Sequence, residues 1–298
     1  MVGSAHLRAL CGALVAISVA ALAGAAAAAP EYVSGGKLLL TGGVSNIEGA
    51  GGGGLATWAV ITGQETRDGI GGDAHATWVS LPGYHLRDYG LAAGFYDRLE
   101  LSYTREEFDT DSTGGKLGLG DGFTFDQDVY GAKLRLFGDA VYDQDRWTPQ
   151  VAVGVQYKVN DKAAIIHAVG GKSADGVDYY VTATKILLDQ SLVLSGAVRL
   201  TKANQTGLLG FGGDRSDNYS AQFEGSAGYL VTRHLAVGAE YRTKPDNLGF
   251  AKEDNWADLF AAYAFCPHLS ATLAYVDLGS IATFRNQRGL YVSLQAGF

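Results

Sequence analysis

The sequence contains little proline, cysteine and methionine, with 5, 2 and 1 of these residues in 298. Two cysteines exclude a disulfide-built scaffold, which needs about four or more. The 23 basic residues are outnumbered by 31 acidic ones, and a net charge of −8 argues against a nucleic-acid-binding protein, which carries a basic footprint. After residue 29, the longest apolar run, Leu259–Cys266, is far shorter than the roughly 18–20 residues of a spanning helix. A helical membrane protein is therefore excluded.

Glycine, by contrast, is abundant, with 42 residues, roughly twice its usual share of about 7%. These glycines follow no three-residue period, which excludes collagen. The chain is also 47% hydrophobic and 11% aromatic, which is too apolar for a disordered protein. This combination predicts a β protein that differs from an ordinary soluble one.

Residues 1–28 have the pattern of a secretory signal peptide. Arg8 is the only charged residue there, a small and apolar run follows it, and Ala26 and Ala28 fit the cleavage rule. We predict export and cleavage after Ala28, with an uncleaved membrane anchor as the alternative. Cleavage would leave Cys266 as the single cysteine, so the mature chain could form no intramolecular disulfide.

Apolar and polar residues alternate along most of the chain after residue 70. In one segment, Leu235, Val237, Ala239 and Tyr241 interleave with polar or small residues. Runs of about ten alternating residues match strands that cross a bilayer obliquely, whereas strands of soluble proteins are typically about 5–6 residues long. The final segment also alternates and ends at Phe298, which resembles the C-terminal strand of bacterial outer-membrane barrels, the strand that is read by the assembly machinery.

Loop lengths give the strand number, because short turns and long loops alternate in such barrels. We predict an all-β fold, a transmembrane antiparallel up-and-down barrel of twelve strands over residues 70–298, closed by the strand that ends at Phe298. Segment 163–170 fits inside a long loop. The predicted strands are 70–80, 86–96, 99–108, 127–137, 148–158, 177–186, 191–202, 219–230, 234–243, 256–265, 268–277 and 289–298.

The glycine-rich segment 29–69 leaves two alternatives open. Residues 35–42 and 55–62 could pair and raise the strand number to fourteen, or the segment could fold into the lumen as a plug. We favour twelve strands.

Several blocks of the sequence resemble a family of exported Gram-negative proteins of unknown function. They are the GGKLLLTGGVSNIEGAGGGG segment that begins at Gly35, then 123–147, 208–215, 244–250 and 285–288. The resemblance covers nearly the whole mature chain. It implies an outer-membrane location, and no functional residue to carry over.

Charged residues on the polar face of the strands are the main candidates for a functional site. They would either line a selective pore or pair to fill a narrow lumen. The candidates are Lys133, Arg135, Arg199, Glu224, Glu240 and Arg242, with Lys158 and Asp178 on the same face.

Other motifs are weak. The glycines at 49, 51 and 54 match a dinucleotide fingerprint only because they lie in a glycine run, without a strand–turn–helix context. The acidic pairs Asp126/Asp128 and Asp143/Asp145 are better explained as strand-end charges than as a calcium loop. The histidines at 75, 85, 167, 234 and 268 have no metal-ligand spacing. We predict no cofactor, no metal and no catalytic residue.

The sequence therefore predicts a monomeric barrel in the bacterial outer membrane, contacting lipid and the assembly machinery but no nucleic acid. A pore for small polar solutes is the favoured function. The alternatives are an outer-membrane enzyme acting on lipid or envelope components and a non-conducting structural barrel.

Overall fold

A computed structural model describes residues 37–42 and 44–298. The predicted signal peptide, residues 1–28, lies outside the described residues and stays a prediction.

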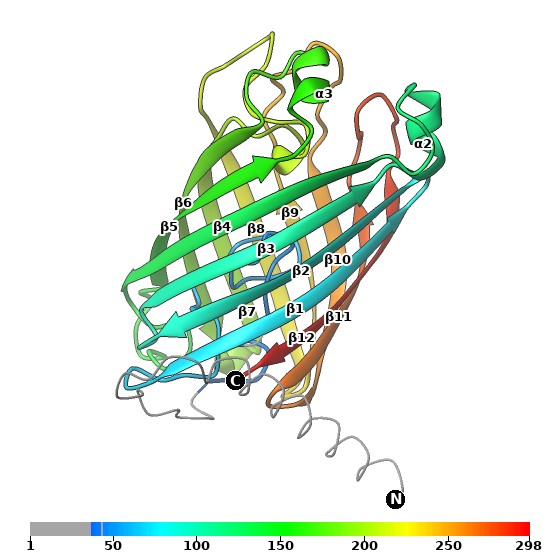
Figure 1. Cartoon of the computed structure of the whole chain (residues 1–298). Coiled ribbons are helices and arrows are strands. Elements are labelled where there is room, and N and C mark those ends of the chain that lie inside the picture. The colour runs from blue at the N-terminus through cyan, green and yellow to red at the C-terminus, as the bar shows by residue number, and fades with distance from the viewer. Residues whose placement is uncertain (1–36, 43) are drawn as a thin grey trace, which may run out of the picture.

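Twelve antiparallel strands form one closed barrel, as predicted (Figure 1). Each strand pairs with its neighbours in sequence, and the first pairs with the last from Asp73↔Gly297 to Ser80↔Leu290. The strands are β1 (Ile70–Leu81), β2 (Tyr84–Phe95), β3 (Leu99–Asp109), β4 (Thr124–Phe137), β5 (Gln150–Asn160), β6 (Asp175–Leu187), β7 (Leu192–Thr201), β8 (Ser220–Thr232), β9 (Leu235–Arg242), β10 (Trp256–Cys266), β11 (Leu269–Asp277) and β12 (Arg288–Gly297).

The fourteen-strand alternative is wrong. The described residues of segment 37–69 form no strand that joins the barrel wall, and contain only isolated bridges at Ser45↔Gly51 and Gly52↔Thr57. Its residues 44–65 are buried inside the barrel instead, as the blue trace in Figure 1 shows.

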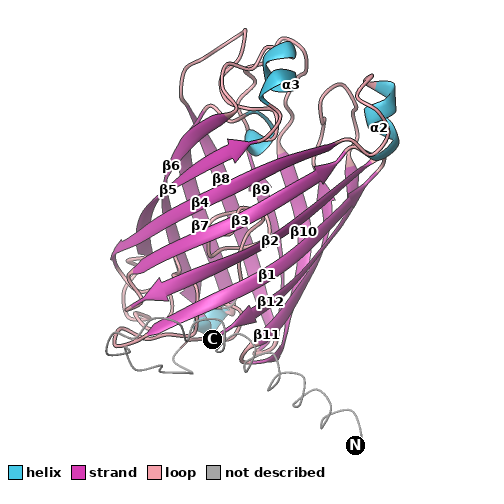
Figure 2. Ribbon diagram, viewed as in Figure 1, coloured by secondary structure: helices cyan, strands magenta, loops and turns pink. Residues whose placement is uncertain are grey.

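The two ends of the barrel differ. At one end, here called the turn end, lie Phe298 and the connections 96–98, 138–149, 188–191, 233–234 and 267–268. At the other, the loop end, lie the connections 110–123, 161–174, 202–219, 243–255 and 278–287, and only the 82–83 turn is short there (Figure 2). Segment 163–170 does belong to a loop, in which it forms the short helix α3 (Ala163–Ala168). The loop end also carries α2 (Asp111–Lys116) and a 3-10 turn, η2 (Asn204–Gly207), while η1 (Leu188–Gln190) lies at the turn end. None of the described helices is long and apolar enough to cross a membrane.

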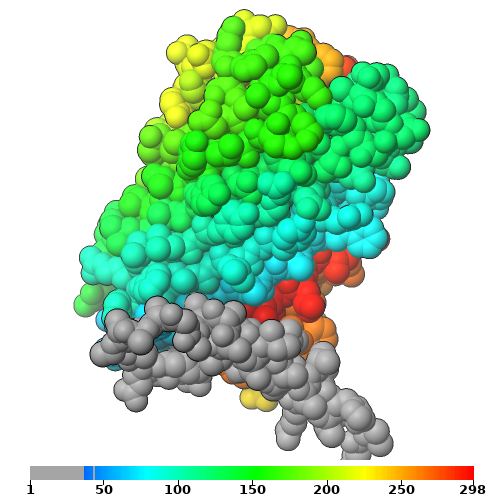
Figure 3. Space-filling model, viewed as in Figure 1, coloured from blue at the N-terminus to red at the C-terminus, as the bar shows by residue number. Residues whose placement is uncertain are grey.

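Alternation separates the two faces of the wall, because successive side chains of a strand point to opposite sides. Large apolar residues point outward, for example Leu259, Leu273 and Leu194, which are 67%, 54% and 43% exposed. The inward residues of the same strands are buried and mostly polar or small. Figure 3 shows the visible outer face as a continuous packed wall.

Candidate functional site in the barrel lumen

Residues 44–65, here called the lumen segment, fill the turn-end half of the barrel interior, and all of them are buried. Such a position requires a segment with few charges. Glu48 is the only charged residue between Lys37 and Glu65, and residues 51–54 are four consecutive glycines.

Inward-facing carboxylates of the wall bind the backbone of the lumen segment. Gly51 N–H donates to Glu100 Oε1 at 3.0 Å, Leu55 N–H to Glu240 Oε2 at 2.6 Å, and Thr57 N–H to Glu224 Oε2 at 2.8 Å. A buried backbone without a strand partner must find other acceptors for its N–H groups. Here the wall supplies these acceptors from β3, β8 and β9.

Cationic side chains of the wall bind the carbonyl groups of the same segment. Lys133 Nζ donates to the carbonyls of Gly51 and Trp58 at 3.1 and 3.2 Å and pairs with Glu100 at 2.9 Å. Arg242 Nη1 donates to the carbonyl of Leu55 at 3.3 Å. The wall therefore recognises the main chain of the segment more than its side chains.

Glycine is required where this main chain comes closest to the wall. A Cβ atom at Gly53 would lie 1.7 Å from Glu240 Oε1. Gly49 has a φ of +83°, and a Cβ there would lie 2.0 Å from Thr104 Oγ1. Side chains at these positions would push the segment away from the groups that bind it.

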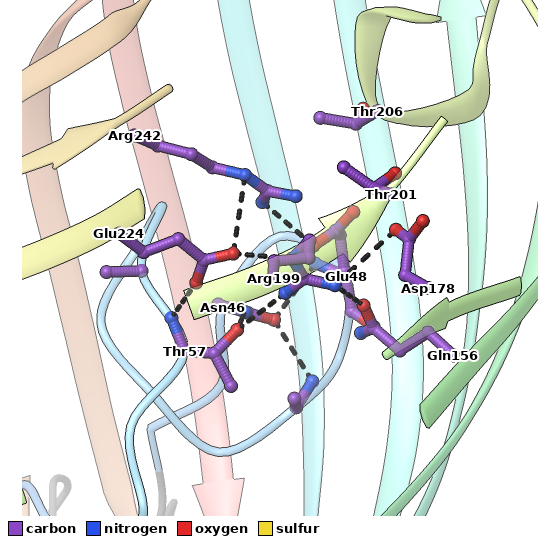
Figure 4. Close-up of polar contacts among 12 residues, drawn as sticks. Asn46, Glu48, Thr57, Gln156, Asp178, Arg199, Thr201, Thr206, Glu224 and Arg242 are labelled. Carbon is purple, nitrogen blue, oxygen red and sulfur yellow. Dashed lines mark hydrogen bonds and ion pairs between the residues drawn. The ribbon is translucent and has the colours of Figure 1, made fainter. Parts of the chain in front are cut away.

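Glu48 joins the lumen segment to three cations of the wall, two of which, Arg199 and Arg242, are labelled in Figure 4. Its carboxylate pairs with Lys158, lies 2.8 Å from Arg242 Nη1 and lies 3.5 Å from Arg199 Nη2. Burial alone would raise the pKa of Glu48, but the charges of Arg242, Lys158 and Arg199 hold it well below its usual range. The Glu48 side chain is therefore ionised inside the barrel.

Two wall carboxylates complete this ionic cluster. Asp178 lies 2.8 Å from Lys158 Nζ, and Glu224 accepts a hydrogen bond from Arg199 Nε at 2.6 Å. With Glu48 in place, three cations thus face three anions. Figure 4 shows Glu48 entering from the lumen segment between the side chains of Arg199 and Arg242.

A second anchor lies where the lumen segment approaches β1. Glu65 Oε1 accepts a hydrogen bond from Lys37 Nζ at 2.9 Å, and Gln64 N–H donates to the carbonyl of Phe298 at 3.0 Å. Burial raises the pKa of Glu65 to about 7, and the opposing charge of Lys37 only partly offsets this effect.

The six predicted lumen residues all lie on the inward side of the wall, and their role in binding a solute stays a prediction. Five of them contact the lumen segment or its cluster: Lys133, Arg199, Glu224, Glu240 and Arg242. Arg135 does not. It pairs with Asp97 and Asp139 in connections at the turn end.

Sequence reasoning missed Glu48 and Glu100. Glu100 shares the inward period of β3, so the same alternation could have identified it. For Glu48 the signal was its isolation as the single charge in a long neutral segment.

The residues of the weak motifs make contacts within the protein. Of the fingerprint glycines at 49, 51 and 54, Gly51 donates its N–H to Glu100 Oε1 at 3.0 Å, so a carboxylate of the wall already occupies this donor. Asp126 and Asp128 both pair with Arg105 at 2.9 Å. His75 lies between Asp73 and Asp88, while His167, His234 and His268 each contact a backbone carbonyl. Among the described residues, no group of three or more His, Cys, Asp or Glu side chains is arranged to hold a metal ion.

Solved structures with a similar fold are bacterial β-barrels. The KdgM porin matches with a TM-score of 0.50 and 10% identity, over 76% of this chain and 99% of the porin. The NanC porin matches with a TM-score of 0.48 and 11% identity, over 76% and 98%. Outer membrane phospholipase A from Escherichia coli matches with a TM-score of 0.42 and 10% identity, over 80% and 94%. At 10% identity the likeness to the KdgM porin shows a porin-like fold alone.

No curated protein matches the chain in sequence. One family model does, over residues 41–295, a range that includes the whole lumen segment and the barrel as far as residue 295 in β12. The chain therefore belongs to the family described as protein of unknown function, DUF3034.

Proposed function

We propose that this barrel crosses the bacterial outer membrane and forms a gated pathway for small polar solutes, closed in the present state by the lumen segment. An outward belt of exposed Leu, Val, Tyr and Phe side chains around the wall supports the membrane location. Strands of 8–14 residues are long enough to cross the bilayer obliquely. Export by the predicted signal peptide and assembly through β12 and Phe298 belong to the same proposal.

The contact between the lumen segment and the wall carries the proposed gating. Every described contact across this boundary is a hydrogen bond, an ion pair or van der Waals packing, so the segment can leave without breaking a covalent bond. When it leaves, Lys133, Arg199, Glu224, Glu240 and Arg242 would line a polar passage.

The free-energy cost of burying charged side chains favours a lumen that has a hydrated state. Buried ion pairs are often no more stable than apolar residues of the same volume, because both ions lose their hydration. In a barrel that stays permanently closed, apolar side chains could fill the lumen at a lower cost in free energy. Charged lumen residues are useful if the passage also exists in a hydrated state.

Single-channel conductance in planar bilayers tests the proposal. The full chain is expected to be mostly silent, with rare openings, and a variant lacking residues 44–65 is expected to conduct steadily. Heat-dependent migration on a gel would verify that both barrels are folded. A folded deletion variant that stays silent would refute the proposed gate and favour the alternatives, an outer-membrane enzyme or a non-conducting structural barrel.

A further inference from the structure

A cavity of about 140 Å³ lies inside the loop end of the barrel, on the far side of the lumen segment from the turn end. We call it the apolar chamber. Its floor, wall and roof include Ile47 from the lumen segment, Leu81, Leu86 and Phe108 from the wall, and Leu119 and Leu208 from the loops.

The inward face of the wall changes from polar to apolar around the chamber. Leu81, Leu86 and Phe108 point inward near the ends of β1, β2 and β3, whereas Glu100 on the same face of β3 is charged. Apolar side chains in a hydrated lumen would be unfavourable unless another apolar surface covered them. The loops provide this cover, so the chamber is built from both the wall and the loops.

Polar contacts fix the loops over the chamber. Gln205 Nε2 donates to the carbonyl of Ser280 at 2.9 Å, which links two loops. A third loop joins them through Lys244, whose Nζ donates to Gln205 Oε1 at 2.9 Å and pairs with Glu253 at 3.0 Å. The roof is therefore a defined structure with its own buried interactions.

The chamber is too large to be an ordinary packing defect. Protein interiors contain few voids larger than a water molecule. A cavity of about 150 Å³ lined by Leu, Ile and Phe stays dry and accepts a molecule of the size of benzene. The volume of this chamber therefore suits one six-membered ring.

Glu106 is the one charged side chain among the described residues that line this space, and its other polar lining residues are Tyr84, Thr110, Gln205, Thr206 and Trp256. Glu106 lines the chamber and is only 2% exposed. Its Oε2 accepts a hydrogen bond from Gln127 Nε2 at 2.9 Å, but among the described residues its Oε1 has no hydrogen-bond partner. A buried polar atom without a partner costs free energy, and a ligand that forms a hydrogen bond with it would remove that cost.

We infer that the apolar chamber binds a small monocyclic molecule that carries one hydroxyl group. The ring would fill the space between Phe108, Leu208 and Ile47, and the hydroxyl would form a hydrogen bond with Glu106 Oε1. This inference concerns the closed state and does not require the lumen segment to move, so it stands or falls separately from the proposed pore.

Titration calorimetry of the full chain in detergent, with phenol as the probe and benzene as the ligand without a donor, tests the inference. Phenol is expected to bind saturably at one site. Val169→Phe adds a ring to the chamber lining and should abolish this binding, whereas Val155→Phe adds the same ring on the outer face of β5 and should leave it unchanged. Equal heats for both variants would mean that phenol only partitions into micelles, and would overturn the inference.

A second variant tests the polar contact. Glu106→Leu removes the hydrogen-bond partner of the hydroxyl, and phenol affinity is expected to fall about tenfold while benzene affinity stays within about twofold. Heat-dependent gel migration verifies that the variant barrel is folded. Unchanged phenol affinity in folded Glu106→Leu would show that Glu106 does not receive the hydroxyl group.

Discussion

Glu48→Gln is the sharpest test of the closed state, because it removes one charge and keeps the shape of the side chain. In the structure, Glu48 is fully buried and faces Lys158, Arg199 and Arg242. Asp178 and Glu224 supply two further negative charges, so the substitution leaves one buried positive charge without a partner.

The expected magnitude follows from this charge count. Removing one partner of a buried ionic cluster typically costs about 3–5 kcal/mol. When the lumen segment is released, water can solvate the same cations, so the cost falls mainly on the closed state. At about 1.4 kcal/mol per tenfold change, the equilibrium should shift toward release by roughly 10²- to 10³-fold or more.

Single-channel recording measures this shift as open probability. Asp189→Asn is the matched control, since it makes the same change of charge at an exposed position at the turn end. Glu48→Gln should open far more often than both the wild type and the control. If its open probability equals that of the control in a folded barrel, the ionic cluster does not hold the segment in place.

Three further predictions concern pH, backbone contact and the lipid-facing wall. Glu65 has a pKa of about 7 when the segment is docked and about 4.5 when it is released. Between pH 4.5 and pH 7 the Glu65 carboxyl is therefore protonated in the docked segment and ionised in the released one. Docking should therefore weaken by up to about 3 kcal/mol as pH rises from 4.5 to 7, open probability should be higher at pH 8 than at pH 5, and Glu65→Gln should flatten this dependence. Gly53→Ala should displace Glu240 and raise open probability, whereas Gly54→Ala, whose Cβ would meet no atom closer than 3.4 Å, should not; equal effects would refute the close-contact argument. Val198→Arg, near the middle of β7 on its outer face, should cost about 2–4 kcal/mol in unfolding from a bilayer, and Leu194→Arg, nearer the turn end, should cost less; equal costs would contradict the assigned depth.

The alternation of apolar and polar residues predicted the strands of the wall, because one face of each strand is in an apolar environment and the other face is in a polar one. This is a local property, and it placed the twelve strands within a few residues of their observed bounds. It also placed Lys133, Arg199, Glu224, Glu240 and Arg242 on the inward face. Arg135 shares that period, but its partners Asp97 and Asp139 lie in connections, where no period applies.

The contacts inside the barrel could not be read from the sequence, because they join segments that no local pattern relates. Glu48 is 110 residues from Lys158, and Leu55 is 185 residues from Glu240. The apolar chamber depends on where several loops meet over the wall. These contacts depend on barrel closure, which the sequence pattern predicts. They also depend on the path of the lumen segment, which the sequence pattern does not determine.

The glycine run of the lumen segment bears on how firmly the barrel is closed. Glycine loses more conformational freedom on ordering than any other residue, by about 0.5–1 kcal/mol relative to alanine. For residues 51–54 together this disfavours docking by roughly 2–4 kcal/mol, which is of the same order as the contribution of about 3–5 kcal/mol assigned to Glu48. The glycines are needed at the closest approach to Glu240, and the same residues make release of the segment entropically favourable. A segment held by opposing terms of similar size can be shifted by the change of a single charge, as a gate requires and a permanent filling does not.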